Sequence, residues 1–264
     1  MLTPVLFIPH GGGPLPLFND ARHAQLIPFL KSAAQYCPNP EAIILISAHW
    51  EERMVHVTSA PQPELYYDYY GFPEASYKLN YPAPGHPELA ASIVTQLQDS
   101  LGQATATTKR GFDHGMFVPL MLMYPKGHIP VVQVSLLDSL SPQDHIQLGK
   151  ALQGFRTQNV LILGSGFSFH NLQAFFQPSP QGNQANQAFQ SWLLDTCTAE
   201  KYTQAERSSR LIDWQNAPHA QFCHPRAEHL LPLHVCYGAS TGPAECIFDD
   251  LVFSKRSIGL MWRS

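Results

Sequence analysis

Three histidines of this 264-residue chain, His10, His49 and His170, each follow a short and strongly apolar run. The runs are Val5-Leu6-Phe7-Ile8, Ile43-Ile44-Leu45-Ile46 and Val160-Leu161-Ile162-Leu163. Such runs, bounded by Gly, Pro and Ser, are typical of buried strands in a parallel sheet. Because the carboxyl ends of these strands open onto a ligand crevice, three imidazoles placed there can converge on one point. Convergent neutral imidazoles most often bind a transition metal.

The first two histidines differ in their surroundings. His10 precedes three glycines, Gly11 to Gly13, which allow a sharp turn and a close approach to a bound group. A phosphate-binding loop is a weak alternative, because the spacing is not G-x-G-x-x-G and no G-K-[ST] follows. A plain turn with an incidental histidine stays open. His49 ends the second expected strand, and its place equivalent to that of His10 favours function over a purely structural role.

The next two histidines follow turn-forming residues. His114 lies just before an expected helix, and the side chain of Asp113 is expected to cap that helix. His114 would then sit near the positive end of the helix dipole, which disfavours its charged form; an idle histidine in a capping motif is the alternative. Before His170, Gly164-Ser165-Gly166 fails the G-x-S-x-G spacing, so a serine hydrolase is poorly supported.

His229 directly follows Glu228. Adjacent residues on a helix point about 100° apart, so both cannot be ligands of one metal if this turn is regular. We expect His224 and His234 to be bystanders. For the remaining histidines, which lie in surface-type contexts, a structural role is favoured: His23, His56, His86, His128, His145 and His219.

Strand and helix patterns alternate along the chain. We expect strands over 4–9, 42–47, 54–58, 104–108, 130–135, 159–164, 246–253 and 256–262. We expect helices over 21–35, 87–101, 114–124, 142–154, 186–198, 203–214 and 227–237. Segments 61–87 and 177–184 are expected loops, and a loop as long as the first is usually functional. The chain is expected to form one α/β domain over residues 1–264. A mostly parallel central sheet would carry helices on both faces and end in an antiparallel hairpin.

Composition narrows the functional class. The net charge is −4 with no basic block, so neither nucleic acid nor a membrane surface is an expected partner. The five cysteines contain no C-x-x-C pair, which argues against a disulfide framework and favours a reducing cytoplasm. The first residues lack the basic region of a signal peptide, and no apolar stretch approaches the roughly 18 residues of a membrane span.

Several motifs occur together in one order along nearly the whole chain. They are His10 to Pro14, Ser47 to Trp50, Gly71-Phe72-Pro73, Tyr81 to Gly85, Gly111 to Gly115, His170-Asn171, and Glu228-His229 with Leu231-Pro232-Leu233. In this order they resemble the class III extradiol ring-cleaving dioxygenases, and most closely the 4,5-DOPA extradiol dioxygenase branch.

The resemblance implies a mononuclear Fe(II) site, with His10, His49 and His229 as the protein ligands. Zn(II) can take the place of iron in purified protein, because it binds imidazole more tightly. By the same resemblance, His170 is the acid–base histidine and a possible fourth ligand when substrate is absent. His114 would lie near the substrate hydroxyl groups.

Two features depart from the family pattern. The common His-Gly-Ser-Pro is here His-Gly-Gly-Gly-Pro, which would reshape the pocket beside the metal, and the run Tyr66 to Tyr70 is unusually rich in tyrosine. Both bear on substrate identity more than on reaction type. We expect Tyr69, Tyr70 and Phe72 to line an aromatic pocket.

The sequence therefore predicts an extradiol dioxygenase that opens the ring of a DOPA-like catechol with O2. A zinc hydrolase using metal-bound hydroxide is a second hypothesis, although no H-E-x-x-H motif supports it. A non-catalytic binding protein on the same fold is a third. The sequence leaves open the physiological substrate, the ring bond cleaved, the native metal and the oligomeric state.

Overall fold

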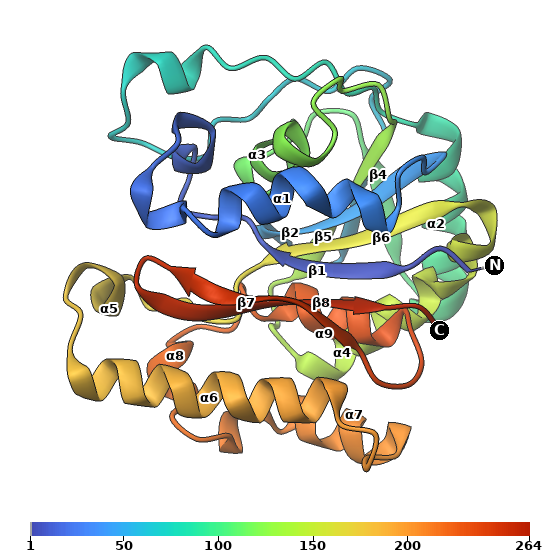
Figure 1. The fold of residues 1–264 in the computed structure, drawn as a ribbon. Coiled ribbons are helices and arrows are strands. Elements are labelled where there is room, and N and C mark those ends of the chain that lie inside the picture. The colour runs from blue at the N-terminus through green and yellow to red at the C-terminus, as the bar shows by residue number, and fades with distance from the viewer. Residues whose placement is uncertain (1) are drawn as a thin grey trace.

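One sheet runs through the computed structural model, which describes residues 2–264 (Figure 1). Its strand order is β4-β3-β5-β2-β6-β1-β8-β7. The strands are β1 (Val5–Pro9), β2 (Ala42–Glu52), β3 (Val55–Thr58), β4 (Ala104–Thr107), β5 (Val131–Leu137), β6 (Val160–Gly166), β7 (Glu245–Val252) and β8 (Lys255–Trp262). Parallel pairing joins β5, β2, β6 and β1, whereas β8 pairs antiparallel with both β1 and β7. The predicted α/β class, mostly parallel sheet and C-terminal hairpin are confirmed.

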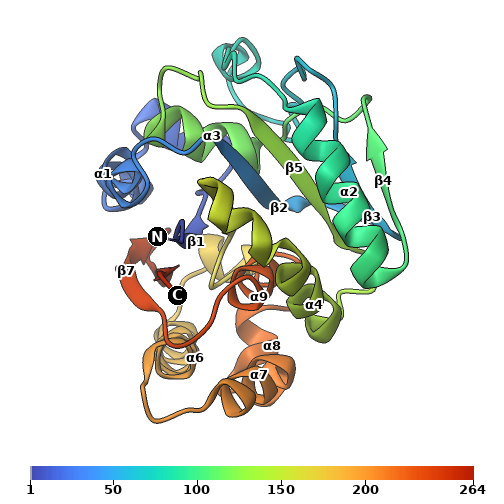
Figure 2. The same ribbon diagram turned by 90° about the vertical axis from the view of Figure 1, so that its right-hand side faces the viewer.

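Helices cover both faces of the sheet, as Figure 2 shows. They are α1 (Leu26–Ala33), α2 (Pro87–Leu101), α3 (His114–Met123), α4 (Pro142–Leu152), α5 (Leu172–Phe176), α6 (Pro180–Thr198), α7 (Gln204–Ile212), α8 (Ala220–Cys223) and α9 (Leu231–Gly238). Because strand side chains alternate between faces, Phe7 and Ile44 pack on the side of α2, α4, α6 and α9. Leu6 and Ile43 pack against α1 and α3 on the other side.

The predicted helix over 21–35 is wrong as a single element. A short 3-10 helix, η2 (Ala21–His23), is followed by α1, which begins at Leu26. Pro28 explains the break, because proline is tolerated in a first helical turn but clashes with the carbonyl four residues earlier in a helix interior. The helix therefore cannot extend back through Ala24.

Two other helix boundaries differ from the expectation for related reasons. Helix α6 begins at Pro180, inside the expected loop 177–184, because the Ser179 hydroxyl caps it by accepting from the Gly182 N–H at 3.0 Å. Helix α9 begins at Leu231 rather than 227, because Pro232 fixes its first turn.

Two histidines expected in surface-type contexts, His23 and His145, are fully buried, so that expectation is wrong. Each satisfies both ring nitrogens within the protein. His145 Nδ1 donates to the Ser141 carbonyl at 2.7 Å, and Nε2 accepts the Leu137 N–H at 3.1 Å. The apolar runs in the sequence do not indicate such internal hydrogen-bond partners, which offset the free-energy cost of burying an imidazole.

Within residues 2–264, the helices lack the combination of length and apolar content that crossing a bilayer requires.

Candidate metal centre and active site

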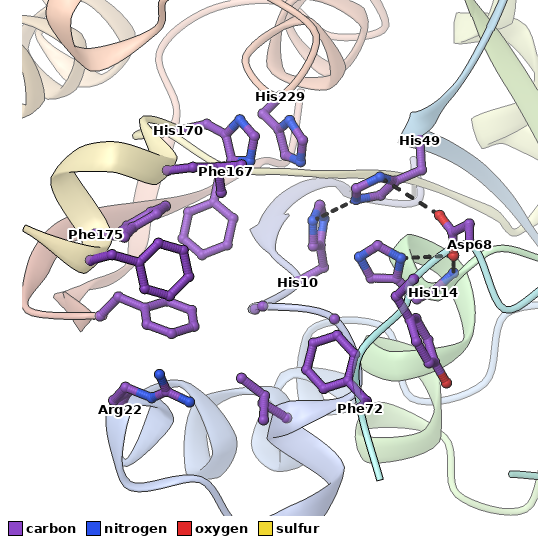
Figure 3. A pocket seen from close by; sticks show the side chains of 18 of the residues that line it. His10, Arg22, His49, Asp68, Phe72, His114, Phe167, His170, Phe175 and His229 are labelled. Carbon is purple, nitrogen blue, oxygen red and sulfur yellow. Dashed lines mark hydrogen bonds and ion pairs between the residues drawn. The ribbon is translucent and has the colours of Figure 1, made fainter. Parts of the chain in front are cut away.

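The carboxyl ends of β1, β2 and β6 bring the predicted histidines to one edge of the sheet (Figure 3). His10 follows β1 directly, and His170 lies four residues after β6. His49 does not end its strand as expected, because β2 continues to Glu52 through an irregularity in its pairing with β5. Such an irregularity re-aims a side chain without ending the strand, and here it turns His49 toward His10.

Three imidazoles meet at the centre of the site. Nitrogen atoms of His10, His49 and His114 lie within 4.8 Å of one another. The Nε2 atoms of His10 and His49 are 3.1 Å apart, and the rings of His49 and His114 have centroids 3.9 Å apart. His114, which the resemblance places near the substrate hydroxyls, thus lies within the potential ligand group.

A second group adjoins the first and contains His170, Glu228 and His229. The His229 ring lies 5.3 Å from the ring of His10 and 4.9 Å from that of His49, measured between centroids. His170 stacks on His229 at 3.4 Å with 15° between their planes. The expected ligands His10, His49 and His229 are therefore neighbours, although the structure divides them between two groups.

Ser165 fixes the orientation of the His10 ring. Its hydroxyl donates to the Gly115 carbonyl, so its oxygen accepts the proton on His10 Nδ1 at 3.1 Å. This arrangement leaves the Nε2 lone pair of His10 facing the cluster. Outer hydrogen bonds of this kind set the tautomer and direction of metal-binding imidazoles. Ser165, which the structure places in the last residues of β6 rather than in a turn, thus orients His10 and is not a nucleophile.

Asp68 performs the same task for His114. Its Oδ1 accepts from His114 Nδ1 at 2.8 Å and from the His114 backbone N–H at 3.0 Å, while its Oδ2 lies 3.7 Å from His49 Nδ1. Burial would raise the pKa of Asp68, but the hydrogen bonds and the nearby charge of His114 lower it. The residue comes from the long loop predicted over 61–87 and holds the first turn of α3.

The expected cap by the Asp113 side chain is wrong, because Asp68 bonds the first N–H of the helix instead. The buried Asp113 carboxylate accepts from the Ser47 hydroxyl at 2.7 Å, from Arg110 Nη2 at 3.0 Å and from the amide of Gln133. Arg110 Nη2 also donates to the His49 carbonyl at 3.1 Å, and the Ser47 hydroxyl accepts the His49 N–H at 3.2 Å. This network holds the backbone of His49 at both ends.

Glu228 orients the second group. Its Oε1 lies 2.8 Å from His229 Nδ1 and 3.2 Å from His170 Nδ1. Burial would raise the pKa of Glu228, but hydrogen bonds to the two imidazoles outweigh it and hold the pKa well below the usual range. Residues 228–230 form a turn before α9 rather than a regular helix, which is why the two adjacent side chains meet.

The imidazoles of His10, His49 and His229 are held neutral. Burial, followed by the repulsion of neighbouring imidazoles, lowers the pKa of His10 and His49 well below the usual value. Burial lowers the pKa of His229 to about 3. Neutral imidazoles with inward lone pairs are the ligands that divalent iron and zinc accept. The residues present therefore fit a transition-metal ion.

A cavity of about 540 Å³ opens in front of the histidines. Tyr69, Tyr70 and Phe72 line it, as predicted. The other lining residues are His10, Gly11, Gly12, Gly13, Leu15, Arg22, His49, Asp68, His114, Phe167, His170, Leu172, Phe175, Phe176, His229 and Phe253. Aromatic side chains thus surround the histidine cluster, as a site for an aromatic ligand requires.

Comparison with known proteins agrees with this architecture. Residues 4–257 match the family described as "Catalytic LigB subunit of aromatic ring-opening dioxygenase". The chain belongs to this LigB family of dioxygenases, and the resemblance inferred from its motifs is confirmed.

Curated relatives share most of the chain. A protein named "Dioxygenase tasH" from Hapsidospora irregularis is 38% identical over 90% of this chain and 78% of its own length. A "4,5-DOPA dioxygenase extradiol" from Beta vulgaris is also 38% identical, over 89% of this chain and 85% of its own. A crystal structure of an uncharacterized protein from Escherichia coli K12 has a TM-score of 0.78 and 27% identity, covering 98% of this chain and 99% of its own.

Asp68, Ser165 and Arg110 are site residues that sequence reasoning missed. Asp68 interrupts a run of tyrosines in the long loop, and an acid within an aromatic stretch was a usable signal. The Gly-Ser-Gly spacing suggests only a nucleophilic role for Ser165, so its bond to His10 was not predicted. Nothing in the local pattern distinguishes Arg110, whose role depends on the distant backbone of His49.

Proposed function

We propose that this chain is a metal-dependent extradiol dioxygenase that opens the ring of a catechol with O2. The observation that carries the proposal is the cluster of imidazoles from His10, His49, His114 and His229 at the end of an aromatic-lined cavity. Membership of the LigB family supports the same reaction type.

In this proposal His10, His49 and His229 hold Fe(II), with a nitrogen of His114 within reach of the same point. Fe(II) would supply the redox chemistry through which a catechol reacts with dioxygen. The buried acceptors behind the rings keep the ligand atoms aimed inward before any ion binds. Zn(II) would fit the same donors and give an inactive form.

His170 is the proposed proton carrier. Glu228 accepts from His170 Nδ1, which leaves Nε2 as the atom that can take a proton. His170 lines the cavity, so this nitrogen can receive the proton of a catechol hydroxyl and return it when the ring opens. His170 stacks on His229, and this proximity supports the proposal that it serves as a fourth ligand in the absence of substrate.

His114 is proposed to stabilise the charge that develops on the substrate oxygen. Asp68 holds the proton on His114 Nδ1, and Figure 3 shows the other ring nitrogen turned toward His10. Tyr69 packs against this ring with centroids 5.7 Å apart and forms the adjacent wall of the cavity. A charge held in such a water-poor site interacts strongly with a fixed polar group.

The test is an oxygen-electrode measurement on protein reconstituted anaerobically with Fe(II), with catechols added singly and absorbance followed. Oxygen uptake together with a new yellow chromophore is the expected result. Zinc-loaded protein is the control and should take up none. No uptake from protein with iron bound would overturn the proposal and favour a hydrolase or a binding protein.

A further inference from the structure

The cavity is larger and more apolar than a catechol ring needs. We propose that the physiological substrate is a catechol bearing an apolar substituent, which packs against an apolar wall of the cavity. This inference rests on the proposed function and deepens it. The apolar wall consists of Leu15, Phe72, Leu172, Phe175, Phe176 and Phe253.

The volume of the cavity is the first observation. At about 540 Å³ it lies in the range that takes drug-sized ligands, whereas a single ring with two hydroxyl groups fills only a fraction of it. The wall is continuous with the metal-binding end. Phe167 lies 5.6 Å from the His10 ring, Phe175 lies 6.0 Å from Phe167, and Phe253 lies 5.2 Å from Phe175, measured between centroids.

The glycines after His10 make room for this wall. A Cβ on Gly12 would stand 2.5 Å from the Phe253 ring, and a Cβ on Gly13 would stand 3.0 Å from Phe72. A larger residue at either position would require the facing ring to shift from its present place. The chain departs from the common His-Gly-Ser-Pro by its extra glycine. The small residues at these positions let aromatic rings approach the backbone beside the metal-binding end of the cavity.

The left-handed backbone conformation at residue 253 disfavours a bulky side chain such as that of Phe253. Phe253 and Ser254 join β7 to β8, with φ of 51° and 61°. Asn and Gly are the residues that such a two-residue hairpin turn favours, and a bulky side chain there costs energy. The Phe253 ring lines the cavity, so contact with a ligand accounts for a residue type that the turn disfavours.

The charged groups of the cavity are already paired. Among the described lining residues, Arg22 and Asp68 are the ones with Arg, Lys, Asp or Glu side chains. Arg22 donates to both carboxylate oxygens of Asp20, at 2.9 and 2.8 Å, and its guanidinium lies 4.9 Å from the centre of the Phe253 ring. Asp68 is bonded to His114. An amino-acid substituent on the catechol would therefore compete with these existing partners for each charged group.

The mouth of the cavity offers further apolar area. Leu172 is 59% exposed and Phe176 is 70% exposed, both on α5 at the rim. Apolar surface gains free energy when a ligand removes it from water. A substituent that reaches past Phe175 would cover these side chains, whereas an unsubstituted catechol would leave them exposed.

The first experiment compares kcat/KM for oxygen uptake with 4-phenylcatechol, catechol and DOPA on the Fe(II) protein. We expect 4-phenylcatechol to exceed DOPA by at least about tenfold, given the apolar area of a phenyl ring. A DOPA value equal or higher would overturn the inference while leaving the proposed function intact. No uptake with any of the three would overturn the proposed function itself.

Binding to metal-free protein keeps the cavity preference testable without turnover. Calorimetry with 4-phenylphenol and with tyrosine, which do not react, should give a Kd at least about tenfold lower for 4-phenylphenol. Equal affinities, or tighter binding of tyrosine, would overturn the inference even if catechols are oxidised.

Two leucines provide a matched pair of variants. Leu172→Asn alters the rim, and Leu251→Asn alters β7 at a residue that is 49% exposed and does not line the cavity. We expect Leu172→Asn to lower the preference for 4-phenylcatechol over catechol several-fold, and Leu251→Asn to leave it unchanged. Equal effects of the two variants would overturn the inference.

Phe253→Asn separates ligand contact from folding. Asparagine suits the left-handed turn, so any loss of packing is partly offset by relief of the backbone. We expect the preference for 4-phenylcatechol to fall about tenfold while urea unfolding still shows a single folded state. An unchanged preference in the folded variant would contradict the role of this ring.

Discussion

At the scale of single residues, the hydrogen-bond partners behind the imidazoles indicate the role of each histidine as clearly as the positions of the imidazoles do. His114 and His229 each turn Nδ1 toward a carboxylate, from Asp68 and Glu228 respectively. A purely structural histidine gains stability from such a bond in the same way. What distinguishes these two histidines is that their remaining ring nitrogens face the same cluster and the same cavity.

His170 and His229 should separate catalysis from metal binding. His170→Ala is expected to keep its iron and lose turnover by roughly 10²–10⁴, the usual size of acid–base catalysis. His229→Ala is expected to lose the metal. Metal content by mass spectrometry and oxygen uptake on the same samples check both. Loss of iron from His170→Ala would make His170 primarily a ligand, and full occupancy in His229→Ala would contradict the three-histidine assignment.

Asp68 should affect metal affinity without being a ligand. Asp68→Asn removes the carboxylate that lies behind His114 and 3.7 Å from Nδ1 of the proposed ligand His49. Outer partners of this kind typically contribute 10- to 100-fold to metal affinity. We therefore expect zinc affinity, measured by competition with a chelator, to fall within that range. Asp250→Asn, on exposed β7, is the control. An affinity unchanged by Asp68→Asn would show that the loop does not orient the site.

At the scale of elements, the strands were predictable and the route of the long loop was not. Buried parallel strands are continuous apolar runs, so β1, β2 and β6 are visible in the sequence. The extension of β2 beyond residue 47 depends on its pairing with β5, which no local pattern encodes. Asp68 reaches His114 through a loop without periodicity, so its hydrogen bond to that residue could not be predicted, although its place in an aromatic run marks it as a candidate.

Helix α4 should make folding pH-dependent through His145. Burial lowers the pKa of His145 to about 4, below the unfolded value of about 6.5. The unfolded chain thus binds this proton first, and the stability of the native state falls as pH drops from about 6.5 to about 4, by up to about 3 kcal/mol.

Urea unfolding at a series of pH values measures this effect. His145→Gln should reduce the slope of stability against pH in that window by about one proton, because glutamine does not titrate. His128→Gln, at an exposed site, is the control and should leave the slope unchanged. An identical slope in wild type and His145→Gln would show that the imidazole does not titrate on unfolding.

At the scale of the whole molecule, the site joins segments from the two ends and the middle of the chain. The order of family motifs made the fold class and the set of histidines predictable, because each motif follows a recognisable strand or turn. The order of the motifs along the chain could not show which imidazole nitrogens lie close together. That depends on distances across the assembled sheet, such as the one between His10 and His49.

Metal binding should therefore stabilise the entire fold. An ion that binds the native state alone adds about 2.7 kcal/mol at a free concentration of 100 Kd. For a chain of this size the melting temperature should rise by roughly 5–10 °C. Calorimetry with zinc and with chelator checks this, and His10→Ala should abolish the difference. A shift retained in that variant would place the ion elsewhere.

The pairing of β1 has a consequence for how the chain folds. Its neighbours in the sheet are β6 and β8, so Val5 lies beside Ile162 on one side and Trp262 on the other. The strand that carries His10 is thus synthesised before both of the strands with which it pairs. Until β6 emerges from the ribosome, Val5 to Ile8 is an unpaired apolar segment of the kind that self-associates. Production of active protein should accordingly depend on chaperones and on slow synthesis more than its final stability suggests.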